Sequence, residues 1–361
     1  MCKSIILYAT NNADINVSKI IIGIHGLGNK PPKKTLEKWW KKSIIEGLER
    51  INKKGINFNF ELIYWADVLN EKPLDEMIVD KEDAYYLEEK YNPALKNFNP
   101  IHHPFRKKIL GFLENQLDKI FLNKDLSPKY SFISKMIIHK YFKELEIYYT
   151  GERYNADNKI CTVKSLIRNK AVEVLKKYKN DDIMFVAHSM GSIVAFDVLT
   201  FILPEIEIET FVTMGSPLGL PIVISKIAEE LKHKQHITKK LQTPHGVKRN
   251  WFNFSDLEDK VAMNYNLGDD YDGNSNGVRA TDFIVNNNYE INGVRNPHKS
   301  YGYLRMPEFA EVIDEFLKRE ESKPGLWIYD YSKNIYGRFN KILKNTKNKV
   351  SSVIRKDKVE S

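Results

Sequence analysis

The chain is 361 residues long and 42% of its residues are hydrophobic, which is enough to build a large buried core. Its two cysteines, Cys2 and Cys161, are too few for a disulfide framework or a cysteine metal site, so we expect a reducing compartment. The net charge of +9 is concentrated in residues 332–361, which contain nine Lys or Arg and two Asp or Glu. The rest of the chain is nearly neutral, which argues against a nucleic-acid partner.

The N-terminal segment does not have the pattern of a secretory signal, because its short apolar run ends at Asn11 and Asn12. The most hydrophobic window, residues 185–204, approaches the length of a membrane span but contains His188 and Asp197. We therefore expect a cytoplasmic protein without a transmembrane helix.

The first predicted strand is a run of β-branched residues over 19–25. It leads into the sequence His25-Gly26-Leu27-Gly28, whose glycines let the backbone turn sharply and leave N–H groups free. In acyl-transfer enzymes such a loop supplies one donor of an oxyanion hole, and here that donor would be the N–H of Leu27. Taken alone, the loop fits an ordinary strand-to-helix turn equally well.

An amphipathic helix over residues 35–53 and a strand over residues 58–65 follow. The alternation of strands and helices then stops for a stretch rich in aromatic residues. We interpret residues 68–157 as a helical cap inserted over a substrate pocket, although the aromatic residues could simply form the core of the cap itself. Helices are predicted in this insertion over residues 80–90, 105–123 and 130–148.

The strongest motif follows a helix predicted over residues 161–178. A buried strand begins at Asp182 and leads into Ala187-His188-Ser189-Met190-Gly191, and an apolar helix pattern then continues to residue 202. A serine at a tight turn between a buried strand and a buried helix is the context of a nucleophile elbow. The elbow requires small residues two before and two after its serine, and Ala187 and Gly191 are small. The N–H of Met190 at the start of the helix would be the second oxyanion donor.

A strand and turn over residues 209–217 and strands over residues 251–254 and 281–286 precede a closing helix over residues 307–319.

A serine hydroxyl needs a base to take its proton, and that base needs an anion to fix its tautomer. In one arrangement of such triads the three residues follow the chain order serine, acid, histidine. Ser189, Asp259 and His298 have this order, and His298 lies in the loop before the closing helix. Asp256 is the alternative acid, and Asp259 is favoured because Val261 resumes the apolar pattern directly after it.

Other histidines fit the role of the base less well. His188 adjoins Ser189 but should project away from it at an elbow, and His25 is expected to support the oxyanion loop. His102 and His103 lack the spacing and partners of metal ligands, so no metal site is predicted.

Together these motifs make the chain resemble an α/β-hydrolase of the serine lipase/esterase type. The resemblance covers residues 18–320 apart from the insertion, and Ala187 departs from the more usual glycine of the elbow. It implies a mostly parallel central sheet flanked by helices, formed by residues 1–67 and 158–331. It also implies a covalent acyl-enzyme with neither a metal nor an organic cofactor. The resemblance rests on His25-Gly26-Leu27-Gly28, Ala187-His188-Ser189-Met190-Gly191, Met214-Gly215-Ser216-Pro217, the segment from Asn253 to Val261 that contains Asp259, and His298-Lys299-Ser300-Tyr301.

The basic tail, residues 332–361, has apolar residues at near-helical spacing with Lys and Arg between them. A basic amphipathic helix of this kind can lie on an anionic membrane, which would make the protein peripheral at the membrane. A solvated or docked tail is the alternative interpretation.

We therefore expect a serine hydrolase that cleaves carboxylic esters, with a small-molecule or lipid acyl ester as its substrate. A thioesterase or an amidase would use the same triad, so these activities stay open. A non-catalytic protein that binds a partner through its cap and tail is a further alternative, although such a protein has no use for a complete triad.

Overall fold

The structure is a computed structural model. It describes residues 18–94, 126, 143–154, 157, 159–234, 241–262 and 264–319.

A six-stranded sheet forms the centre of the fold, and every neighbouring pair of its strands is parallel. The prediction of an α/β fold with a mostly parallel central sheet is confirmed. Parallel strands buried on both faces need continuous apolar sequence, and the strand before Ser189 has it, with six of its seven residues buried. The strands are β1 (Lys19–Ile24), β2 (Asn59–Ile63), β5 (Asp182–His188), β6 (Ile208–Met214), β8 (Val247–Asp256) and β10 (Ala280–Val285).

The order of the strands across the sheet, β10-β8-β6-β5-β1-β2, reverses once. From β1 the chain moves to the edge strand β2, and it then crosses back to place β5 on the other side of β1. The later strands are added outward from β5. The chain therefore leaves the carboxyl ends of the neighbouring strands β1 and β5 in opposite directions across the sheet. Such a place is called a switch point, and in open α/β sheets it is where ligands bind.

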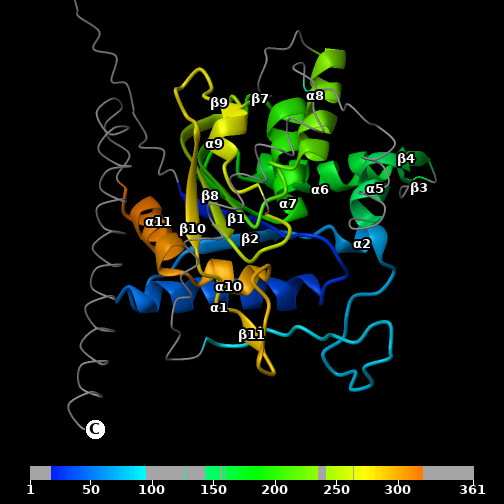
Figure 1. The fold of residues 1–361 in the computed structure, drawn as a ribbon, viewed down its shortest axis with the longest axis vertical. Helices are drawn as coiled ribbons and strands as arrows, with labels where there is room; N and C mark the ends of the chain where they lie inside the picture. The colour runs from blue at the N-terminus through cyan, green and yellow to red at the C-terminus, as the bar shows by residue number, and fades with distance from the viewer. Residues whose placement is uncertain are drawn as a thin grey trace, which may run out of the picture.

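Helices cover both faces of the sheet (Figure 1). Side chains alternate between the faces along a strand, so Ile20, Ile22 and Ile24 of β1 enter one apolar core and Ile21 enters the other. The first core is covered by α5 (Lys143–Thr150), α6 (Val163–Lys177), α7 (Met190–Asp197) with the π-helical turn Val198–Ile202, and α8 (Pro221–Lys234). The second core is covered by α1 (Lys33–Arg50), α10 (Ser300–Leu304) and α11 (Pro307–Lys318).

The smaller elements lie in the connections. They are α2 (Ala66–Leu69), the pair β3 (Glu152–Tyr154) and β4 (Ile160–Thr162), the pair β7 (Leu241–Gln242) and β9 (Tyr271–Asp272), α9 (Leu267–Asp270), and the pair β11 (Glu290–Ile291) and β12 (Val294–Arg295).

None of the helices in the described ranges is long and apolar enough to cross a membrane.

The prediction of a helix over residues 80–90 is wrong. This segment consists of turns and bends, and Tyr86 forms an isolated bridge with Asp75. The side chains of Asp75, Asp80 and Asp83 each accept a hydrogen bond from the backbone N–H two residues ahead, over 2.9, 3.0 and 2.7 Å. Such bonds satisfy the backbone in a turn and compete with the helix. The aspartate turns therefore decide the structure of this segment.

Most of the other predictions for the insertion fall outside the described residues. This applies to the helix over residues 105–123 and to His102 and His103. The helix predicted over residues 130–148 overlaps the described part only in α5. The basic tail, residues 332–361, also lies outside.

A buried ionic cluster joins the helices beneath the elbow. Arg168 of α6 donates two hydrogen bonds to the carboxylate of Glu230 on α8, over 2.9 and 2.8 Å. The same guanidinium lies 2.7 Å from Asp197 of α7, and the hydroxyl of Tyr148 on α5 donates to Asp197 over 2.6 Å. The side chain of Asp197 is only 1% exposed. The cluster thus fixes α7, which begins directly after Ser189, to three neighbouring helices.

We expect the Asp197→Asn substitution to lower the free energy of unfolding by about 3 kcal/mol, because it removes a negative partner from a buried guanidinium. Asp67→Asn is the matched control, since Asp67 and its ion-pair partner Lys170 are 49% and 37% exposed. Its effect should stay below about 1 kcal/mol. Urea unfolding of the two variants measures the difference, and equal losses of stability would contradict this account.

Candidate functional site

Ser189 is the apex of the turn between β5 and α7. Its backbone has φ 55° and ψ −133°, a left-handed conformation that a residue with a side chain rarely adopts. Its N–H donates a hydrogen bond to the carbonyl of Met214 at the end of β6, over 2.9 Å. The residue is 2% exposed. The sequence pattern predicted this strained turn, and the neighbouring strand holds it in place.

The turn packs so closely on β1 and its loop that glycine is required at two positions. A Cβ atom added to Gly191 would lie 2.6 Å from the carbonyl oxygen of His25, and one added to Gly26 would lie 2.5 Å from the Cβ of Ser189. Real Cβ atoms essentially never approach other atoms so closely. Ala187 is fully buried in β5, so a single methyl group is accommodated there. The loop after β1 is thereby brought into direct contact with Ser189.

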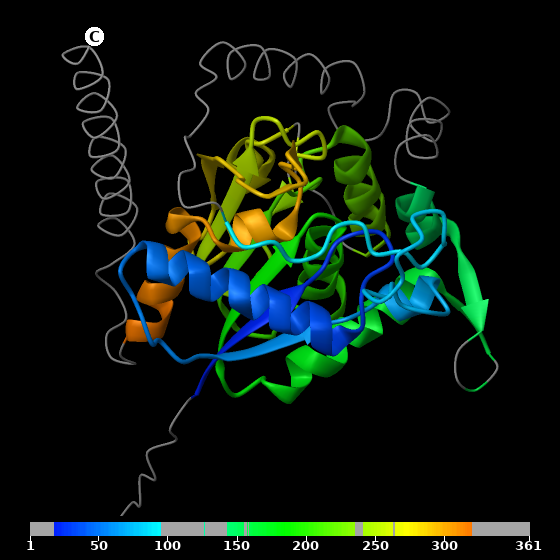
Figure 2. The ribbon, with the colours of Figure 1, turned by 90° about the horizontal axis from the view of Figure 1, so that it is seen from below.

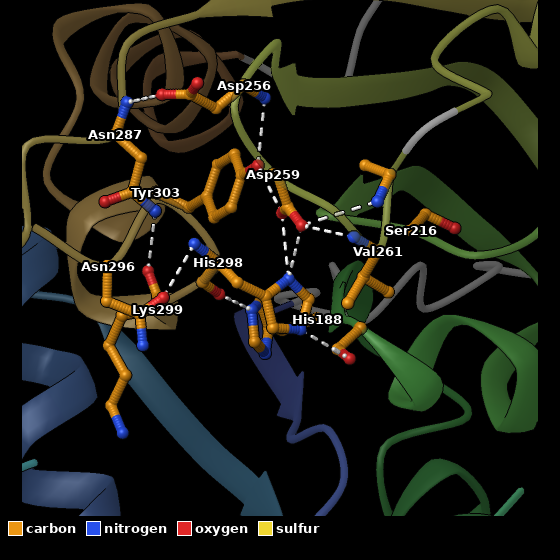
Figure 3. A network of polar contacts seen from close by, with 12 residues as sticks. His188, Ser216, Asp256, Asp259, Val261, Asn287, Asn296, His298, Lys299 and Tyr303 are labelled. Carbon is orange, nitrogen blue, oxygen red and sulfur yellow. Dashed lines mark hydrogen bonds and ion pairs between the residues drawn. The ribbon is translucent and has the colours of Figure 1, made fainter. Parts of the chain in front are cut away.

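The structure brings Ser189, His298 and Asp259 together in a continuous line of hydrogen bonds. His298 Nε2 lies 2.9 Å from the Oγ of Ser189. On the other side of the ring, Nδ1 lies 2.8 and 2.9 Å from the two carboxylate oxygens of Asp259 (Figure 3). The carboxylate is fully buried, whereas the imidazole is 29% exposed. The ring can therefore exchange a proton with a molecule bound at the surface while its inner nitrogen stays fixed.

The carboxylate of Asp259 is held by donors other than His298. The backbone N–H of Val261 donates to Oδ1 over 2.9 Å, and the hydroxyl of Tyr303 donates to Oδ2 over 2.8 Å. Gly215, the first residue after β6, has φ +54°, and a Cβ atom there would lie 2.7 Å from Oδ2. The orientation of the carboxylate, and with it the tautomer of His298, is thus fixed by three chain segments.

Asp256, the alternative acid, is directed elsewhere. Its carboxylate accepts the backbone N–H groups of Asn287 and Glu258 over 2.7 and 2.8 Å, and it forms an ion pair with Arg295 at 2.6 Å. In Figure 3 it points toward Asn287 and away from His298. Asp256 therefore anchors the chain that leads to the histidine loop, and Asp259 is the acid in contact with the ring.

The two predicted oxyanion donors, Leu27 and Met190, follow β1 and β5. Met190 is the first residue of α7, so its N–H has no acceptor within the helix. Leu27 follows Gly26, which contacts Ser189. Within the described ranges, neither N–H donates to a backbone acceptor outside a helix or strand.

His25 supports the loop of Leu27. Its Nε2 accepts the backbone N–H of Trp65 over 3.0 Å, which leaves the proton on Nδ1, 2.8 Å from the carbonyl of Gly26. The ring also stacks on the indole of Trp65 at a centroid distance of 4.8 Å. Burial lowers the pKa of His25 to about 3, the positive charge of Lys30 adds to this effect, and the hydrogen bond to Gly26 opposes it.

His188 contacts His298 directly. Its Nε2 lies 2.7 Å from the carbonyl oxygen of His298, and the two ring centroids are 4.9 Å apart. Burial lowers the pKa of His188 well below its ordinary value, and the neighbouring His298 lowers it further. The neutral ring thus donates a hydrogen bond that positions the backbone of His298.

Two contributors to the site were missed from the sequence. Tyr303 holds Asp259 from α10, and Asn296 accepts the backbone N–H of His298 through its side chain over 3.0 Å. The Asn-Pro dipeptide before His298 is a turn signal that could have identified Asn296. Tyr303 lies five residues after His298 on α10, and only the fold brings its hydroxyl to Asp259.

Comparison of the chain with protein-family models, with curated proteins and with solved structures found no match. A hydroxyl, an imidazole and a buried carboxylate in one line can activate an oxygen nucleophile.

The neutral state of His25 predicts acid sensitivity. An unfolded histidine binds a proton near pH 6.5, whereas folded His25 does so only near pH 3. Between these values the unfolded state binds the extra proton, so the free energy of unfolding falls as the pH falls. We expect a loss of about 2 kcal/mol from His25 between pH 7 and pH 5.

Urea unfolding across this range measures the total loss, to which the buried neutral ring of His188 also contributes, and the NMR signal of the His25 ring isolates the part from His25. The signal should not titrate above pH 4. A midpoint near pH 6.5 would contradict the buried, neutral ring.

Proposed function

We propose that this protein is a serine hydrolase of the α/β-hydrolase fold that cleaves carboxylic esters through an acyl-enzyme. Ser189 is the nucleophile, His298 the general base and acid, and Asp259 the residue that fixes the tautomer of His298. The observation that carries the proposal is the line of hydrogen bonds from Ser189 Oγ through both ring nitrogens of His298 to Asp259.

The position of the serine in the sheet supports this proposal. Ser189 follows β5 at the point where the strand order reverses, which is where ligands bind in open parallel sheets. Asp259 follows β8, and His298 lies between β10 and the last two helices. The chain order serine, acid, histidine on a parallel sheet is the order found in α/β-hydrolases.

The first half of the proposed reaction forms the acyl-enzyme. Ser189 Oγ attacks the ester carbonyl carbon while its proton passes to His298 Nε2. The carbonyl oxygen becomes an oxyanion, which the N–H groups of Leu27 and Met190 stabilise. His298 then gives its proton to the leaving alkoxide, and the C–O bond of the ester breaks. Asp259 stays ionised and stabilises the imidazolium between these two transfers.

The second half regenerates the serine. A water molecule gives a proton to His298 and attacks the acyl carbon, which yields a second oxyanion in the same two N–H groups. His298 returns the proton to Ser189 Oγ as the acyl–oxygen bond breaks and the carboxylic acid leaves. No group other than water is consumed.

The surroundings of the serine favour an apolar acyl group. The side chain of Leu27 packs against the apolar cluster that includes Met190, Leu218 and Leu220. Apolar side chains on the segments around Ser189 suit a hydrocarbon chain better than a charged substituent, because burying a charge without a partner is costly. We therefore propose an acyl or lipid-type ester as the substrate. Contact of residues 332–361 with an anionic membrane stays a prediction.

Ser189→Ala should abolish both labelling by a fluorophosphonate probe and hydrolysis of p-nitrophenyl acyl esters. Loss of the nucleophile in such triads costs about a millionfold in kcat. The matched control is Ser275→Ala, because Ser275 Oγ also lies 2.9 Å from a histidine ring, that of His245, but on the exposed surface. This control should be labelled like the wild type. Labelling that survives in Ser189→Ala, or folded wild-type protein that is never labelled, would overturn the proposed function.

The two aspartates give a second test. Asp259→Asn should lower kcat about ten-thousandfold, because an amide donor facing Nδ1 selects the wrong tautomer of His298. Asp256→Asn should change kcat by less than about tenfold but lower the free energy of unfolding by about 2 kcal/mol, since it loses the ion pair with Arg295. Ester hydrolysis and urea unfolding measure the two effects. The reverse pattern would make Asp256 the acid of the triad.

A further inference from the structure

Residues 70–94, here called the strap, connect two parts of the site that are distant in the sequence. At one end the strap is bonded to the loop after β1, which carries Leu27. The backbone N–H of Leu74 donates to the carbonyl of Lys30 over 2.9 Å, and the side chain of Asn29 donates to the carbonyl of Lys72 over 2.9 Å. In Figure 2 the strap, light blue to cyan, crosses the molecule from the region of α2 toward α10.

At its other end the strap is bonded to the chain around His298. The hydroxyl of Tyr289 donates to the carbonyl of Lys90 over 2.7 Å, and the side chain of Asn92 donates to the carbonyl of Glu290 over 2.6 Å. Between these two ends, Leu87 is buried in the core shared by α1, α10 and α11. The strap is therefore attached along its length, even though it has no regular secondary structure.

One strap side chain, that of Glu89, reaches the histidine loop itself. One of its carboxylate oxygens lies 2.6 Å from the ammonium of Lys299, the residue after His298. The other oxygen accepts the side-chain amide of Asn296. The Oδ1 of the same Asn296 accepts the backbone N–H of His298 over 3.0 Å. Glu89 thus binds the residues on both sides of the backbone that carries the imidazole.

The charges around Glu89 favour its ionised form. Burial raises the pKa of Glu89, but the charge and hydrogen bond of Lys299, the amide of Asn296 and the charge of Lys30 outweigh it, and the pKa is lowered overall. The ammonium of Lys299 lies 5.5 Å from the centre of the Tyr301 ring, which further defines its position. The carboxylate is therefore a charged anchor for the loop of His298.

We infer that Glu89 is a positioning residue of the proposed active site, which holds His298 within reach of Ser189 by binding Lys299 and Asn296. This inference rests on the proposed function. The 2.9 Å distance between Nε2 and Oγ depends on a loop without helix or strand, and such a loop needs fixed points on both sides of the histidine. His188 and Asp259 supply fixed points from the sheet side, and Glu89 supplies them from the strap.

Glu89→Gln tests the inference, with Glu88→Gln as the matched control. Glu88 is the neighbouring strap residue and is exposed, so its substitution removes the same charge without touching the histidine loop. We expect Glu89→Gln to lower kcat for a p-nitrophenyl ester by about tenfold to a hundredfold, with a smaller change in KM, because a displaced base costs rate rather than binding. Glu88→Gln should keep the wild-type kcat.

The pH profile separates positioning from a general loss of stability. In Glu89→Gln the ammonium of Lys299 has lost its partner beside His298, so the acid limb of kcat/KM should move to lower pH. The double variant Glu89→Gln/Lys299→Gln should move it back, whereas Lys299→Arg, which keeps the ion pair, should retain the wild-type profile. A variant that had only lost folded protein would show a lower rate with an unshifted acid limb of kcat/KM.

The inference about Glu89 and the proposed function can fail separately. If the wild-type protein is labelled by the fluorophosphonate probe at Ser189, and Glu89→Gln matches Glu88→Gln in both kcat and pH profile, the inference about Glu89 is overturned and the proposed function stands. If the folded wild-type protein is not labelled, the proposed function fails first.

Discussion

The close approach of the loop after β1 to the turn after β5 is the constraint on which the site depends. Ser189 adopts a left-handed backbone conformation, and such strain persists only when the surroundings over-determine it. Here the surroundings are the hydrogen bond to Met214 on one side and the end of β1 with its loop on the other. Ser189 leaves no room for a side chain at Gly26, and the carbonyl oxygens of Ile24 and His25 leave none at Gly191. The same contact brings the loop that carries Leu27 against the serine.

The base of the proposed triad is held in a different way. His298 lies in a loop, and its position comes from the sum of several hydrogen bonds rather than from a helix or strand. Asp259 holds the ring, His188 holds the carbonyl, and Asn296 holds the N–H. A buried polar network of this kind stabilises a unique arrangement only when its members are satisfied. Here Val261 and Tyr303 donate further hydrogen bonds to Asp259, and the carboxylate of Glu89 accepts the side-chain amide of Asn296. These bonds satisfy the remaining polar groups of the network.

How far the sequence predicts the molecule depends on how local the determining interactions are. The elbow could be predicted, because strand, turn and helix are encoded within about twenty neighbouring residues. The order of Ser189, Asp259 and His298 came from the resemblance and from the strands between them. The sequence favours Asp259 over Asp256 through the apolar pattern that follows Asp259. The reason that Asp256 is directed elsewhere is its ion pair with Arg295, which only the fold brings to it. Residues 80–90 were mispredicted because the side chains of Asp80 and Asp83 form turns that compete with a helix.

The separation of the site residues along the chain has a consequence for synthesis. Ser189 lies 109 residues before His298, and Glu89 lies 210 residues before Lys299. Domains begin to form from the N-terminal side while the ribosome is still adding residues. β1, β2, β5 and the elbow are therefore made long before the base that would activate Ser189. A chain arrested before His298 carries the serine without its base, so in the proposed mechanism the nascent protein has no esterase activity until the histidine loop has left the ribosome and closed over the sheet.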